Sequence, residues 1–219
     1  MSVEGALRHR LGPTDCLIET FRYEPDHGFL RLDRHLHRLE RSAAILGFRF
    51  DHTAINLVLS ELLREQDTLR VRLTLDRAGN PEATTQALIP LAKDTIWTLR
   101  LAATRLPSHD TLLGHKTTRR TLYESARAEF AQGEAQEVLL SNERNELCEG
   151  TITNFFVDRG NGIFATPPLA SGLLPGVLRS ELLETGRAVE QVLTPSDLQE
   201  GRIYVGNSLR GLIAARLAG

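Results

Sequence analysis

The hydrophobic pattern of this 219-residue chain changes its period, and that change limits the fold more than any other feature. Early in the chain the apolar residues recur at steps of four and three, which is the spacing of one helix face: Leu32, Leu36, Leu39, Ala43 and Leu46. Later they alternate with polar residues, as in a half-buried strand: Leu69, Val71, Leu73 and Leu75. A chain with both periods is expected to fold as an α/β protein.

The same patterns predict two lobes. In the first, helices are expected at 32–46, with Asp33 as N-cap, and at 51–63, with Asp51 as N-cap. A strand at 68–75 turns at 76–80 and pairs with 85–91, and a further strand at 95–103 leads into a polar loop. We place the lobe boundary near Lys93, which gives a smaller lobe at 1–93 and a larger one at 94–219.

The larger lobe is expected to begin with a helix at 117–131. The stretch 137–166 then predicts a meander of three strands, with "NERN" and "DRGNG" as its turns. A helix at 176–185, a short strand at 203–205 and a closing helix at 207–217 complete the prediction.

Composition excludes several classes of protein. Hydrophobic residues make up 41% and charged residues 25% of the chain, which is typical of a globular domain rather than a disordered one. The net charge of -2 argues against a dedicated nucleic-acid or membrane-surface binder. Two cysteines, no signal-like start and no apolar run of about 18 residues predict a cytoplasmic protein without a membrane span.

Three apparent motifs are better explained by structure than by chemistry. Gly160, Gly162 and Ala165 fit the dinucleotide fingerprint, but "TPP" follows where its helix would begin. His35 and His37 are two residues apart on a helix, so we expect solvated histidines on different faces and no metal site. Cys148 precedes an acid rather than a base, which favours a small buried residue over a nucleophile.

Five stretches make chemical sense together. Lys116 in "GHKTTRR" lies where a loop is expected to meet a helix, and Glu149 begins "EGTITN" between two strands. Arg38 lies on the polar side of the first helix, and "LPGVLR" and "GNSLRG" each open a predicted helix. Taken alone, each of these residues has an ordinary surface or turn explanation, and only their combination indicates a site.

The order of five segments resembles the class IV aminotransferase family, the pyridoxal-phosphate enzymes of fold type IV. These segments are "RHLHRLERSAAILGF", "HKTTRR", "NERNELCEGTITNFFV", "TPPLASGLLPGVLR" and "VGNSLRGL". The resemblance extends from about Leu17 to the end of the chain. Within the family, "HKTTRR" with "NSLRGL" is most similar to the aminodeoxychorismate lyase branch. It implies two α/β lobes with the cofactor between them.

The resemblance also implies roles for individual residues. Lys116 would form the Schiff base with pyridoxal phosphate and act as acid and base, and Glu149 would pair with the pyridine nitrogen. Arg38 would bind the phosphate, together with the backbone N–H groups of Val177 and Leu178 and the hydroxyl of Ser208. Thr20 faces the cofactor in the family and is a candidate to assist proton transfer. Arg22 and Arg210 are candidates for a substrate carboxylate, or else for surface ion pairs.

The implied reaction converts 4-amino-4-deoxychorismate to 4-aminobenzoate and pyruvate, with a homodimer as the expected assembly and aminodeoxychorismate synthase as a possible partner. The alternatives are transamination of a branched-chain or D-amino acid, and a non-catalytic binding protein on the same scaffold. Two departures bear on this choice. The segment before "LIETFRY" is shorter than in family members, and position 121 is threonine near where branched-chain transaminases carry a tyrosine, with Tyr123 two residues later.

Overall fold

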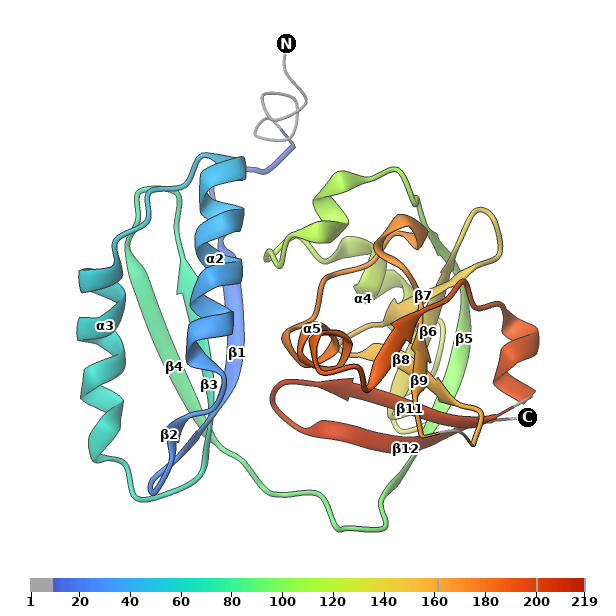
Figure 1. The fold of residues 1–219 in the computed structure, drawn as a ribbon. Helices are drawn as coiled ribbons and strands as arrows, with labels where there is room; N and C mark the ends of the chain where they lie inside the picture. The colour runs from blue at the N-terminus through green and yellow to red at the C-terminus, as the bar shows by residue number, and fades with distance from the viewer. Residues whose placement is uncertain (1–9, 161, 200, 219) are drawn as a thin grey trace. The chain divides into compact units, whose positions relative to one another are not determined.

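A computed structural model describes residues 10–160, 162–199 and 201–218 (Figure 1). By packing, the chain divides into two compact units. Unit 1 contains the residues up to Pro90 together with His115–Arg119, and unit 2 contains Leu91–Gly114 and the residues from Arg120 onward. The division after Pro90 lies close to the lobe boundary expected near Lys93.

Unit 1 is an antiparallel sheet covered by helices on one face (Figure 1). The sheet has the order β2-β1-β3-β4, formed by β1 (Leu17–Glu24), β2 (Gly28–Phe29), β3 (Leu69–Leu75) and β4 (Pro81–Ala87). Helix α2 (Leu32–Leu46) packs on β1, and α3 (His52–Ser60), extended by a 3₁₀ turn at Glu61–Arg64, packs on β4. The apolar stripe of α2 and the inward residues of β3 therefore share one core.

The sequence predictions for unit 1 are largely confirmed. Residues of β3 alternate between buried and half-buried positions, and the Asp51 carboxylate accepts from the N–H groups of Thr53 and Ala54 as a helix cap does. The predicted cap Asp33 is wrong, because it lies in the first turn of α2 and Arg31 precedes the helix. The hairpin partner of β3 begins at Pro81 rather than residue 85, because Asp76 binds Asn80 and tightens the turn.

Unit 2 is built on an eight-stranded sheet that closes on itself. Its order is β10-β9-β8-β11-β12-β5-β6-β7, and β7 also pairs with β8. The strands are β5 (Ile96–Leu106), β6 (Glu137–Asn142), β7 (Leu147–Gly150), β8 (Asn154–Asp158), β9 (Phe164–Thr166), β10 (Ala188–Glu190), β11 (Arg202–Asn207) and β12 (Gly211–Leu217). Helix α4 (Thr121–Ala128) packs on β5 and β6, and α5 (Val177–Glu184) packs on β10 and β11.

The predicted closing helix at 207–217 is wrong. Residues 207–211 form the tight turn of an antiparallel hairpin in which Asn207 pairs with Gly211. Gly211 has φ 76°, a left-handed conformation that glycine adopts without strain. Ile213 points into the core and is 4% exposed, opposite Val205. The apolar residues at 209, 212 and 213 have a helical spacing, but the stretch is too short to distinguish a helical pattern from a strand pattern.

Two further elements of unit 2 differ from expectation. Helix α4 begins at Thr121 rather than 117, because residues 116–118 pair with β1 in unit 1. The meander has four strands rather than three, since Thr151–Thr153 makes an additional turn between β7 and β8. The turn at "NERN" is confirmed, with positive φ at Asn145. In "DRGNG", Gly160 and Gly162 also have positive φ, and the asparagine between them lies outside the described residues.

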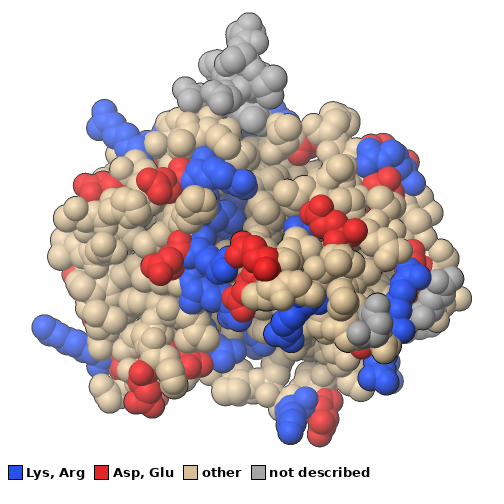
Figure 2. Space-filling model, in the orientation of Figure 1, with Lys and Arg blue, Asp and Glu red and all other residues tan. Residues whose placement is uncertain are grey.

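Charged side chains of both signs are interspersed on the face of the molecule seen in Figure 2. Within the described ranges, no helix is both long enough and apolar enough to cross a membrane. The same ranges contain no grouping of three or more His, Cys, Asp or Glu side chains that could hold a metal ion.

Candidate active site

Lys116 lies on a short extended segment that completes the sheet of unit 1. Its carbonyl accepts from the Ile18 N–H at 2.9 Å, and the Thr118 N–H donates to the Cys16 carbonyl at 2.9 Å. Thr117 forms an antiparallel bridge with Leu17. The Thr118 hydroxyl also accepts a hydrogen bond from the Cys16 N–H. The predicted loop-to-helix position is therefore refined: strand pairing, rather than a helix N-terminus, fixes the backbone of Lys116.

A buried ionic cluster lies between β1 and α2 of unit 1. Glu19 accepts from Arg38 through Nε at 2.8 Å and through Nη2 at 2.6 Å, and its Oε2 lies 2.6 Å from Nδ1 of His35. The exposed fractions are 1% for Glu19, 1% for His35 and 9% for Arg38. The prediction that His35 is solvated is wrong, whereas His37, on the other face of α2, is exposed as expected.

The charges of this cluster are set by its burial. Burial alone would raise the pKa of Glu19, but the charge of Arg38 and the hydrogen bonds from His35 and Arg38 lower that pKa to about 2. Burial lowers the pKa of His35; the bond to Glu19 opposes this, and the charges of Arg38 and Lys116 add to the lowering. Since an ionised carboxylate can only accept, Nδ1 of His35 carries the proton of its bond.

The orientation of the Arg38 guanidinium is fixed by this arrangement. A guanidinium group has five N–H donors in a fixed fork, and the bidentate pair with Glu19 engages two of them. The pair also fixes the orientation of the group, which lowers the entropy lost when it binds a second oxyanion. Its placement is compatible with the predicted phosphate role.

Thr20 and Arg22 lie on the sheet face of β1 opposite to Glu19, because side chains alternate along a strand. Thr20 is paired in register with Arg72, and Arg22 with Arg70. Arg22 also makes an ion pair with Glu24, at 3.1 Å between Nη1 and Oε1 and with both side chains 26% exposed. The ion-pair alternative considered for Arg22 is therefore present in the structure.

Glu149 is the centre of a hydrogen-bonded cluster in unit 2. Its Oε1 accepts from the Tyr123 hydroxyl at 2.7 Å and from the Leu174 N–H at 3.1 Å, and its Oε2 lies 3.4 Å from Nδ2 of Asn154. Glu149 is 5% exposed and is paired with Asn154 across β7 and β8. These hydrogen bonds fix the orientation of the Glu149 carboxylate. A carboxylate held in this way is suited to accept a hydrogen bond from a protonated ring nitrogen.

A second buried carboxylate holds the turn that follows Glu149 and Gly150. Glu137 is fully buried and accepts from the backbone N–H and hydroxyl of Thr151, the N–H of Ile152 and the hydroxyl of Thr153. These bonds span 2.6 to 3.0 Å. A Cβ on Gly150 would lie 2.5 Å from the Thr153 hydroxyl and 2.7 Å from the Glu137 carboxyl group, so only glycine fits beside this turn.

Helix α5 begins beside Glu149 with free backbone donors. Its N-cap, Gly176, makes no side-chain cap bond, and the first N–H groups of a helix have no partner within it. Val177 and Leu178 open this helix as predicted. A Cβ on Gly176 would lie 1.8 Å from Oδ1 of Asn154, which explains the glycine of "LPGVLR".

Ser208 and Arg210 lie in the β11–β12 turn rather than at a helix start, which corrects the prediction for "GNSLRG". Ser208 is 7% exposed, and the Arg210 N–H donates to Oδ1 of Asn207 at 3.0 Å. Asn207 Nδ2 in turn donates to the Ile152 carbonyl at 3.2 Å. The β11–β12 turn is thereby bound to the Thr151–Thr153 turn of the same unit. Ser208 and Arg210 do not lie at a helix N-terminus, so no helix dipole acts there.

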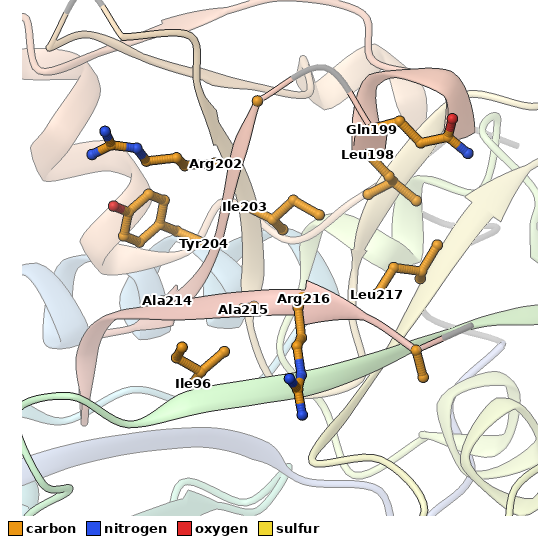
Figure 3. A pocket seen from close by; sticks show the side chains of 12 residues that line it. Ile96, Leu198, Gln199, Arg202, Ile203, Tyr204, Ala214, Ala215, Arg216 and Leu217 are labelled. Carbon is orange, nitrogen blue, oxygen red and sulfur yellow. The ribbon is translucent and has the colours of Figure 1, made fainter.

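Unit 2 also has an open groove of about 570 Å³ along β11, β12 and the start of β5 (Figure 3). Leu198, Ile203 and Leu217 form much of its apolar wall. Arg202 and Arg216 supply its charged side chains, and its lining includes neither a carboxylate nor any residue of the predicted site. The groove therefore lacks the acid and base groups of the Glu149 cluster.

The model of the family described as "Amino-transferase class IV" matches residues 16–217, which is nearly the whole chain. The chain belongs to the class IV aminotransferases. It is an enzyme of this pyridoxal-phosphate-dependent family, with the mixed α/β, two-sheet architecture of fold type IV.

Individual relatives of this class IV enzyme carry two kinds of name. A Schizosaccharomyces pombe protein named "Putative aminodeoxychorismate lyase" is 31% identical over 204 residues, covering 89% of this chain and 86% of the relative. A Mesorhizobium loti structure titled as a "Putative amino-acid aminotransferase" is 55% identical with a TM-score of 0.91, covering 93% of this chain and all of that one. A Pseudomonas aeruginosa 4-amino-4-deoxychorismate lyase shares the fold, with a TM-score of 0.76 at 22% identity and coverage of 93% and 83%.

Sequence reasoning missed the residues that hold the named ones in place. Glu19, Tyr123, Glu137 and Asn154 each bind a predicted site residue or the turn that carries it. One signal was available, because Glu137 opens a strand whose six residues are all buried, and a buried carboxylate needs partners. Cys148, by contrast, is buried as predicted.

Proposed function

We propose that this class IV enzyme is a pyridoxal-phosphate-dependent lyase that converts 4-amino-4-deoxychorismate to 4-aminobenzoate and pyruvate. The observation that carries the proposal is the lyase name of a relative that aligns with 89% of the chain. A homodimer is part of the proposal, as is aminodeoxychorismate synthase as the source of the substrate.

The side chains present fit the cofactor. The chain supplies the Lys116 amine and the Arg38 guanidinium, whose fork is oriented by Glu19. It also supplies the Glu149 carboxylate, which is held by Tyr123, Leu174 and Asn154, and the N-terminus of α5, which has no side-chain cap. An amine, an anion for the ring nitrogen and donors for a phosphate form the donor set that pyridoxal phosphate requires.

In this proposal Lys116 holds the cofactor and then serves as the base. When bound, pyridoxal phosphate acts as an electron sink for the carbon next to the substrate nitrogen. The Lys116 amine removes the proton from that carbon as the enolpyruvyl group leaves, and returns a proton as pyruvate is released. Formation of the aromatic ring of 4-aminobenzoate drives the step.

Glu149 and Arg38 hold the cofactor in position. The Glu149 carboxylate stabilises a proton on the ring nitrogen, which increases the pull of the ring on electrons. Arg38 and the Val177 and Leu178 N–H groups bind the phosphate through charge-assisted bonds. Thr20 assists proton transfer, and Arg210 binds a substrate carboxylate. Ser208 adds its hydroxyl to the phosphate site.

Transamination is the second candidate, and the 55% identical Mesorhizobium loti protein titled as an amino-acid aminotransferase favours it. A transaminase would have to pass the substrate nitrogen to a keto acid, which the lyase does not need. For branched-chain substrates the absence of a tyrosine at position 121 argues against this reaction, and the Tyr123 hydroxyl is bonded to Glu149. A D-amino acid therefore remains the better transamination substrate.

The deciding experiment supplies 4-amino-4-deoxychorismate to the purified enzyme and follows 4-aminobenzoate and pyruvate. We expect both products in equal amounts without any added keto acid. If no pyruvate forms, but 2-oxoglutarate accepts nitrogen from a D-amino acid, the lyase assignment is wrong and the transaminase assignment holds.

Replacing Lys116 tests the catalytic assignment. Lys116→Ala should remove the yellow colour of the bound cofactor and lower kcat by about 10⁴-fold or more, because both the cofactor attachment and the base are lost. Lys93→Ala, which changes a lysine of the inter-strand stretch, is the matched control and should keep colour and rate. A coloured, active Lys116→Ala protein would contradict the assignment, and a colourless wild type saturated with pyridoxal phosphate would favour the non-catalytic alternative.

A further inference from the structure

Tyr123 is placed so that its hydroxyl can change the proton affinity of the Glu149 carboxylate. Its hydroxyl donates to Oε1 of Glu149 at 2.7 Å, a short bond to a charged acceptor. The Leu174 N–H donates to the same oxygen at 3.1 Å. The other oxygen, Oε2, lies 3.4 Å from Nδ2 of Asn154.

The surroundings keep the Tyr123 hydroxyl a donor. Burial, the Glu149 charge and the bond to Glu149 raise the pKa of Tyr123 well above its usual value, against a smaller lowering by Arg120. The Arg120 guanidinium lies over the Tyr123 ring, 4.8 Å from its centroid, and its Nη2 donates to the Thr151 carbonyl. The Tyr123 ring is thus covered by Arg120, which is itself bound to the turn that follows Glu149.

We infer that Tyr123 is a positioning residue that, through Glu149, keeps the proton on the cofactor's ring nitrogen; this inference rests on the proposed role of Glu149. A proton that is shared between the carboxylate and the ring nitrogen lies on whichever of the two groups is the stronger base. Donation by Tyr123 and Leu174 stabilises the charged carboxylate, so it lowers the proton affinity of Glu149. The proton then stays on the nitrogen, where it strengthens the electron sink.

Removing the hydroxyl should therefore move the proton toward Glu149. A hydrogen bond to a charged group is worth about 1.5–3 kcal/mol, which corresponds to about one to two pKa units. In Tyr123→Phe we expect the apparent pKa of the ring nitrogen to fall by about one unit or more. We also expect kcat to fall by about 10-fold or more with KM little changed, because the loss affects the electron sink rather than substrate binding.

The test uses the holoenzyme loaded with pyridoxal phosphate labelled with ¹⁵N at the ring, whose chemical shift reports protonation directly. The shift is followed over a pH titration for wild type, Tyr123→Phe and the matched control Tyr204→Phe, a half-buried tyrosine of β11. The control should give the wild-type titration. If Tyr123→Phe also gives the wild-type titration, the inference is overturned.

A second variant covers the case in which Tyr123→Phe folds or loads poorly. Replacing Tyr123 alone by 3-fluorotyrosine keeps the shape of the ring and makes the phenol a stronger donor. The apparent pKa of the ring nitrogen should then rise, which is the opposite direction, and an unchanged or lowered value overturns the inference. Failure of the proposed cofactor site is recognised separately, because wild type would then show no bound label, and failure of the lyase assignment alone is recognised by the absence of pyruvate.

Discussion

At the scale of single residues, the candidate site depends on buried carboxylates that face donors rather than water. Glu19 orients Arg38, and Glu149 is itself oriented by Tyr123 and Leu174. Neither arrangement resembles a surface ion pair, because burial makes each charge costly unless it is paired. Such residues are therefore as sensitive to substitution as the groups that would touch the cofactor.

Glu19→Gln tests the buried pair through its dependence on pH. The pKa of Glu19 falls from 4.5 to about 2 on folding, so its charge contributes about 3 kcal/mol at pH 7. A lowered carboxyl pKa stabilises the fold above pH 4.5, and this contribution is lost as the pH falls toward 2. Urea unfolding should therefore show Glu19→Gln about 3 kcal/mol less stable at pH 7, with a smaller difference at pH 3.

The half-exposed Glu24 provides the control for this comparison. Glu24→Gln removes a pair with Arg22 in which both side chains are 26% exposed, and it should change the free energy of unfolding by less than about 1 kcal/mol. A difference between wild type and Glu19→Gln that is the same at pH 3 and pH 7 would show that the charge of Glu19 is not the stabilising group.

At the scale of elements, the turn between β7 and β8 sets the register that pairs Glu149 with Asn154. Glu137 fills the inside of this turn, and Gly150 leaves room for it. The Ile152 N–H donates to the Glu137 carboxylate, and the Thr151 N–H donates both to Glu137 and to the Val138 carbonyl. These bonds hold the backbone of the turn in one conformation.

Gly150→Ala should destabilise this element. The added methyl group would have to displace the Thr153 hydroxyl or the Glu137 carboxyl group, and overpacking of this kind costs about 1–3 kcal/mol. Thermal unfolding should show a lower Tm for Gly150→Ala. Gly114→Ala is the matched control, because a Cβ there meets nothing within 4 Å, and its Tm should be nearly unchanged. Equal Tm values for the two variants would contradict this account of the turn.

At the scale of the whole molecule, the proposed cofactor ligands come from segments that are far apart in the sequence. Arg38 lies on α2, Lys116 follows β5, and Glu149 lies on β7. Loading with pyridoxal phosphate should therefore slow amide hydrogen exchange at Ile18 and Thr118 as well as at Leu174 and Val177. Mass spectrometry of the loaded and unloaded protein measures this directly. Protection at only one of these two pairs of amides would mean that the proposed set of ligands is wrong.

The sequence predicted the elements whose patterns are long and local. The helix at 32–46 and the strand at 69–75 have at least seven residues of unbroken period, and Asp51 caps its helix through neighbouring residues only. The helix at 207–217 was wrong because a short hairpin depends on a turn at Gly211 and on partners elsewhere in the chain. Tertiary pairing overrode the local pattern there.

The sequence motifs named candidate site residues but not the residues that hold them in place. Lys116 and Glu149 were named from the resemblance, and their catalytic and cofactor roles stay predictions. Tyr123 was noted only as a tyrosine near position 121 and Glu137 was not named, because their partners lie 26 and 14 or more residues away, in contacts that no local pattern encodes. His35 was misjudged for the same reason, since its partner Glu19 lies on another element.

The pairing of residues 116–118 with β1 affects how the chain can fold during synthesis. When the first 90 residues have left the ribosome, the backbone at Cys16 and Ile18 still lacks its neighbour, which is made only after the first strand of unit 2. A nascent or truncated product of that length exposes a bare strand edge, which invites association with other chains. A split-protein complementation scheme cut after Pro90 would therefore separate Lys116 from the strand with which its segment pairs.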